Sequence, residues 1–75
     1  MATNTDTSRA VARAVSAALK EAGIAQRDAA SRTGLPITTL SRRLTGNSPF
    51  NIDELEIIAD LLGRPVSDFI PQAAA

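Results

Sequence analysis

Residues 37–42 read ITTLSR and bring hydroxyl, guanidinium and aliphatic side chains close together. Thr38 and Arg42 are four positions apart, so they share one face of a helix. Ser41 flanks that face, and Ile37 lies at its edge. Arginine most often reads guanine O6 and N7, hydroxyl groups hydrogen-bond to many partners, and an aliphatic group can contact a thymine methyl. We predict that these four side chains contact base edges in the major groove of double-stranded DNA; the alternative is an ordinary solvated surface.

Two short helices separated by a tight turn must position those side chains. The first is expected over residues 26–32 and the second over residues 36–44, where Pro36 suits the first helical position. Gly34 between them supplies the positive φ that a sharp reversal requires. Ala30 is small enough to let the two helices cross closely. The segment therefore predicts a helix-turn-helix.

Over about residues 9–69 the chain resembles the helix-turn-helix regulators of the phage repressor and Cro class, which share a lambda-repressor-like DNA-binding domain. The positions that carry the resemblance are Gln26, Ala30, Gly34, Leu35, Leu40 and Gly46. It implies a sequence-specific transcriptional regulator, a phage-type repressor or Cro-like protein that acts by promoter occlusion. The chain departs from the family at Arg43, where an apolar core residue is usual, and at Pro36, where a small polar residue is usual.

The resemblance also implies that Gln26, at the start of its helix, holds a DNA phosphate with its side chain and the helix N-terminus. The alternative is a local helix cap. Further phosphate contacts are predicted at Arg27, Thr39, Arg43 and Asn47. For Arg43 the alternative is an aliphatic stem that covers the edge of the core. The remaining cations away from the motif are expected to be solvated: Arg9, Arg13, Lys20 and Arg64.

The net charge is zero, but the charges are unevenly distributed along the chain. Residues 9–43 contain seven basic and two acidic residues, whereas residues 44–75 contain one basic and five acidic residues, and Asp6 completes the balance. A domain with this charge separation can present a basic face to phosphates. Ordinary solvated faces can show the same separation.

The length of 75 residues suffices for one small domain, and the chain has no Cys and no His. Their absence excludes disulfides, thiolate chemistry, the usual zinc ligands and the usual general base. No apolar run approaches the roughly 18 residues of a membrane span, and the polar start MATNTDTS does not resemble a signal peptide. We expect a cytoplasmic protein that is not an enzyme, needs no cofactor or metal, and has neither a membrane nor a small-molecule substrate as a partner.

The predicted fold is all-α, a compact bundle of about five short helices. We expect a flexible arm over residues 1–7, the DNA-binding domain over residues 8–70 and a loose tail over residues 71–75, with the first helix beginning near residue 7 or 8. Asn51 and Glu54 have the spacing of a capping box at the start of the fourth helix. The inward faces of the first, third and fourth helices comprise Val11, Val15, Ala18, Leu19 and Ala22; Leu40 and Leu44; and Ile52, Leu55, Ile58, Ala59 and Leu62.

Ile57 and Leu61 fall on the opposite side of the fourth helix, among acidic residues. With Val66, Phe69 and Ile70 they could form a homodimer interface. If Phe69 and Ile70 instead fold back over them, the free chain is a monomer that pairs on DNA or serves as one module of a longer repressor. A rival interpretation is a protein-interaction module, such as an antitoxin-like partner domain, that docks through the acidic side of this helix. Paired catalytic carboxylates are disfavoured because these acids suit helix capping.

Overall fold

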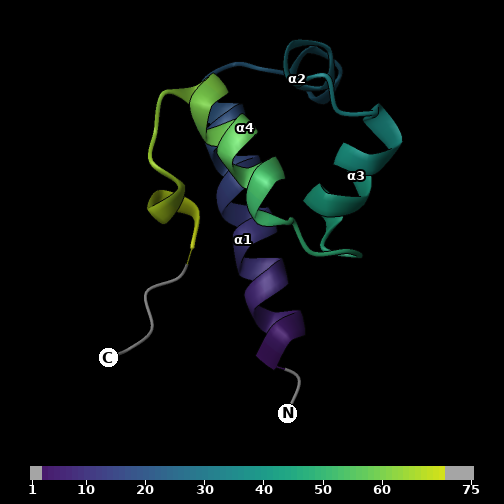
Figure 1. The fold of residues 1–75 in the computed structure, drawn as a ribbon, viewed down its shortest axis with the longest axis vertical. Helices are drawn as coiled ribbons and strands as arrows, with labels where there is room; N and C mark the ends of the chain where they lie inside the picture. The colour runs from purple at the N-terminus through teal and green to yellow at the C-terminus, as the bar shows by residue number, and fades with distance from the viewer. Residues whose placement is uncertain (1–2, 71–75) are drawn as a thin grey trace.

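A computed structural model describes residues 3–70, which form four α-helices and one turn of 3₁₀ helix (Figure 1). The elements are α1 (Thr3–Glu21), α2 (Gln26–Thr33), α3 (Ile37–Thr45), α4 (Ile52–Leu62) and the 3₁₀ helix η1 (Val66–Phe69). The all-α expectation is confirmed, and the fifth expected helix is the 3₁₀ turn. Within the described residues, no helix combines the length and the apolar character that a membrane crossing requires.

Helix α1 begins at Thr3, four residues or more before the expected start. Several Thr, Ser and Asp residues precede residue 9, and each is a competent N-cap, so the sequence does not single out one start. Residues 3–7 therefore belong to α1 rather than to an arm. Residues 1–2 of the predicted arm and the whole predicted tail, residues 71–75, lie outside the described residues.

The core is formed by the inner face of α1 together with buried residues of the other four elements. Val15, Leu40 and Ile58 are fully buried, and Ala29 and Ala30 of α2 are small enough to let that helix approach its neighbours closely. The buried members are Val11, Ala12, Val15, Ala18, Leu19, Ala29, Ala30, Leu40, Leu55, Ile58, Ala59 and Phe69. Two expected core positions are exposed: Ala22, because α1 ends one residue earlier, and Ile52, because it is the first residue of α4.

Two glycines allow the chain to turn on either side of α3. Gly34 ends α2 with φ of 81°, and its N–H donates to the carbonyl of Ala30 at 2.9 Å. Gly46 ends α3 with φ of 85°, and a Cβ at this position would lie 3.2 Å from Cγ of Arg9 on α1. Both turns require a left-handed conformation that glycine adopts without strain. The second turn also brings the end of α3 against α1.

The C-terminal segment folds back over the bundle and contacts both α1 and α4. Figure 1 shows η1 and α3 on opposite sides of α1. Phe69 is 2 % exposed and belongs to the core, so the expectation that it contributes to a dimer interface is wrong. The reason is that η1 turns its aromatic ring inward, where burial of a large apolar side chain stabilises a small domain most.

Candidate nucleic-acid interface

Helix α3 presents one polar face to solvent. Thr38 and Arg42 are exposed, Ile37 is 43 % exposed and Ser41 is half-buried. The predicted exposure of the first three side chains is confirmed, and the structure brings all four together within the first six residues of one helix. When such a helix enters a major groove, its N-terminal residues are the ones that contact base edges, which suits Ile37 and Thr38, whereas Arg42 lies in the last turn of α3.

The opposite face of α3 anchors the helix to the bundle. Leu40 is fully buried, and Leu44, one turn later, is half-buried against the core. Helix α3 packs against α1 and α2. Pro36 has extended backbone angles and is the N-cap rather than the first helical residue, so Ile37 opens the helix. The leucines therefore fix which side of α3 faces outward.

The predicted phosphate contacts lie around α3 on different elements. Gln26 is the first residue of α2 and is exposed, and Arg27 follows it, also exposed. Ala25 at the N-cap makes no side-chain cap hydrogen bond, so it leaves the first amides of α2 uncapped by a side chain. Thr39 is half-buried on α3, and Asn47 is exposed just beyond its end. The free backbone N–H groups at the start of α2 and the side-chain amide of Gln26 can both donate hydrogen bonds to an anion such as a phosphate.

Two basic residues that we expected to be solvated lie beside this surface. Lys20 of α1 lines a small hollow of about 180 Å³ together with Gln26 of α2 and Leu44 of α3. Arg9 lies against the turn at Gly46. Arg9 is distant from the helix-turn-helix in sequence, whereas Lys20 is six positions before Gln26, and the packing of α1 against α3 places both beside it. Helical spacing does place residues 9, 13, 16 and 20 on one face of α1. The spacing alone does not indicate which other helix lies beside that face.

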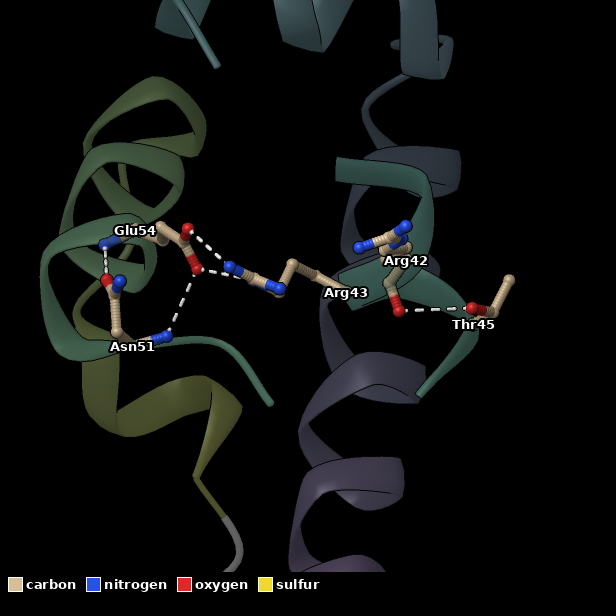
Figure 2. Close-up of polar contacts among 5 residues, drawn as sticks. All are labelled: Arg42, Arg43, Thr45, Asn51 and Glu54. Carbon is tan, nitrogen blue, oxygen red and sulfur yellow. Dashed lines mark hydrogen bonds and ion pairs between the residues drawn. The ribbon is translucent and has the colours of Figure 1, made fainter. Parts of the chain in front are cut away.

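Arg43 does not join the exposed face, because it forms an ion pair that competes with its predicted phosphate contact. Its Nε donates to Oε1 of Glu54 at 2.8 Å, and its Nη2 donates to Oε2 at 3.1 Å. The two side chains are 21 % and 10 % exposed. Figure 2 shows Arg43 extending from α3 to α4, whereas the side chain of Arg42 stays over α3. Helical spacing within α3 could not distinguish a phosphate contact of Arg43 from an ion pair with Glu54, because it contains no information about α4.

Glu54 also completes the predicted capping box of α4, which is confirmed. The N–H of Glu54 donates to Oδ1 of Asn51 at 2.7 Å, and the N–H of Asn51 donates to Oε1 of Glu54 at 3.1 Å. Hydrogen bonds from Arg43 and then from the Asn51 N–H lower the pKa of Glu54, while burial opposes them. The same pair raises the pKa of Arg43. One carboxylate therefore joins α3 to the first turn of α4.

The lowered pKa of Glu54 predicts how stability depends on pH. The folded state holds this pKa below the unfolded value of about 4.3, so the carboxylate stabilises the fold above that pH and the contribution is lost as pH falls through the folded pKa. We expect the difference in melting temperature between wild type and Glu54→Gln to be present at pH 7 and to disappear on acidification. Thermal unfolding followed by circular dichroism from pH 7 to pH 3 measures it. Parallel curves of melting temperature against pH for the two proteins would contradict this expectation. The control is Glu56→Gln, which replaces an exposed acidic residue of α4.

Three acidic residues line a shallow groove of about 750 Å³ between α4 and the segment that leads into η1, and Arg64 lines it as well. Asp53, Glu56 and Asp60 line it with Ile57, which is 39 % exposed, and Val66. None of its lining residues belongs to α2 or α3. The structure therefore separates the exposed arginine and threonine side chains of α3 from the acidic side of the domain.

Comparison with known proteins gives one match. Residues 15–69 match the model of a family described as helix-turn-helix. The matched range contains α2, α3, α4 and η1 together with the last seven residues of α1. No curated protein and no solved structure matches the chain significantly.

Proposed function

Because the chain belongs to the helix-turn-helix family of the repressor and Cro type, whose members are DNA-binding transcription regulators, we propose that it binds a specific sequence of double-stranded DNA through α3. Thr38 and Arg42 read base edges, with Ser41 and Ile37 contributing at the border of the contact. Gln26, Arg27, Thr39 and Asn47 hold phosphates on either side. Arg43 is no longer among the proposed phosphate contacts.

The observation that carries this proposal is the outward orientation of Thr38 and Arg42 on a helix whose leucines are buried. Among the residues whose side chains the structure describes, Arg42 has no salt-bridge partner, so its guanidinium is available for a bidentate contact to guanine. Bound in this way, the domain covers the major groove and the flanking backbone. If the site overlaps a promoter, the polymerase is excluded, which is the repression expected of a phage-type or Cro-like regulator.

Selection of bound sequences from a random DNA pool tests the proposal. We expect a short recurrent motif, and binding to it should weaken steeply with salt. If about four phosphates are contacted, affinity falls by roughly 100-fold between about 50 and 200 mM salt. A random duplex of equal length is the matched control. Recovery of no motif would contradict the proposal. The rival is a protein-interaction module that docks through the groove at Ile57, and binding through that apolar side chain should depend little on salt.

We propose further that the free chain is a monomer and that two copies pair on DNA. With Phe69 in the core, the exposed apolar side chains of the predicted interface are Ile57 and Ile70, at 39 % and 40 %, while Leu61 and Val66 are half-buried. The neighbouring carboxylates oppose the approach of an identical groove. Sedimentation at micromolar concentration should give a single 7.8 kDa species. A species of twice that mass without DNA would contradict this expectation, and half-sites about one helical turn apart would support pairing on the operator.

A further inference from the structure

Two adjacent arginines near the end of α3 occupy different environments. Arg42 is exposed, and Arg43 is held by two hydrogen bonds to Glu54 on α4. Consecutive residues on a helix point about 100° apart, so both side chains cannot share the outward face. Arg43 does share its flank with Thr39, four residues earlier, which is one of the proposed phosphate contacts. If it were free, its long side chain would therefore be within reach of the DNA backbone.

Glu54 is well placed to keep Arg43 away from DNA. Glu54 is 8 % exposed. Its two carboxylate oxygens accept hydrogen bonds from Nε and Nη2 of Arg43 in the side-by-side geometry that is strongest between a guanidinium and a carboxylate. The Asn51 N–H fixes the same carboxylate from the other side. Figure 2 shows this pair joining α3 to α4.

We infer that Glu54 is a specificity-determining positioning residue: by holding Arg43 against α4, it prevents a second arginine from making a sequence-independent phosphate contact beside Arg42. The inference rests on the proposed function, since it takes α3 as the helix that enters the groove. Specificity is the difference between the affinities for the correct and the wrong sequences. An additional phosphate contact strengthens binding to every sequence and can decrease the discrimination between them.

The test compares four proteins: wild type, Glu54→Gln, Arg43→Met and the double variant. Glutamine keeps an oxygen that can accept from the Asn51 N–H, so the capping box can persist without the charge. Binding to the selected duplex and to a scrambled duplex is measured by fluorescence anisotropy across salt concentrations, at a temperature where circular dichroism shows each protein folded.

Release of Arg43 in Glu54→Gln should increase the affinity for scrambled DNA and steepen the slope of log affinity against log salt by about 0.9. Between about 50 and 200 mM salt, the variant should therefore lose roughly threefold more affinity than wild type. Arg43→Met in the same background should restore the wild-type slope. An unchanged slope and an unchanged ratio between the two duplexes would show that the pair only stabilises the fold.

A measurement on the wild type keeps the inference testable if a variant does not fold. In a nitrogen-15-labelled sample, the Nε–H signal of Arg42 should shift when the selected duplex is added, and that of Arg43 should keep its position. A large shift of the Arg43 signal would overturn the inference while leaving DNA binding intact. If the wild type shows no preference between the selected and scrambled duplexes, it is the proposed function that fails.

Discussion

Replacement of Arg42 by alanine should weaken binding to the selected DNA site by about 1–3 kcal/mol, or roughly 5-fold to 150-fold. Arg42 is exposed on the outward face of α3, so its removal should not disturb the core. The loss should be concentrated at one base pair, because a bidentate contact to guanine is lost while the phosphate contacts remain. Titration of duplexes that carry each substitution at every position of the site measures both effects.

Two variants provide controls for this result. Arg64→Ala removes the same charge from the segment between α4 and η1, where Arg64 pairs with Asp68, and should leave sequence preference unchanged. Gln26→Ala should weaken binding to all sequences alike, because a phosphate contact carries no base information. If Arg42→Ala keeps the full selectivity of the wild type, Arg42 does not read bases.

Replacement of Leu40 by alanine should have the largest effect on stability. Leu40 is fully buried, and truncation of a buried leucine costs about 2–5 kcal/mol. A core in a domain of this size supplies about 3–5 kcal/mol of net stability, so the variant should lose a large part of it and unfold at a much lower temperature and urea concentration than wild type. Urea and thermal unfolding followed by circular dichroism measure the change.

Ile37→Ala is the matched control on the same helix. Ile37 is 43 % exposed, so its truncation should change the free energy of unfolding by no more than about 0.5 kcal/mol. It should nevertheless weaken DNA binding if it contacts a thymine methyl. Equal melting temperatures for Leu40→Ala and wild type would contradict the assignment of Leu40 as the anchor of α3.

Features that depend on neighbours along the chain were predictable from the sequence. Gly34 ends α2, and the pair Asn51 and Glu54 caps α4, because a left-handed turn and a capping box each involve residues only a few positions apart. The inward direction of Leu40 also follows from helical spacing. These features are local, and they suffice to predict the helix-turn-helix.

Features that depend on contacts between distant residues were not predictable. Arg43 and Glu54 are 11 positions apart, so the sequence placed Arg43 at an expected core position but could not indicate that Glu54 holds it. The sequence left two places open for Phe69, a dimer interface or a position folded back onto the domain, and η1 turns it into the core. Lys20 and Gln26 are only six positions apart, but the hollow that they line together with Leu44 of α3 depends on how the helices pack.

The most direct measurement of which surface faces DNA is a titration of nitrogen-15-labelled protein with the selected duplex, followed by backbone amide chemical shifts. The outward side of α3 is expected to approach the bases, so the largest shifts should occur over residues 37–42 and at Gln26 and Arg27. Amides along the groove, such as those of Glu56, Asp60 and Val66, should change little. Large shifts along that groove with little change over residues 37–42 would contradict the assignment of α3 as the recognition helix.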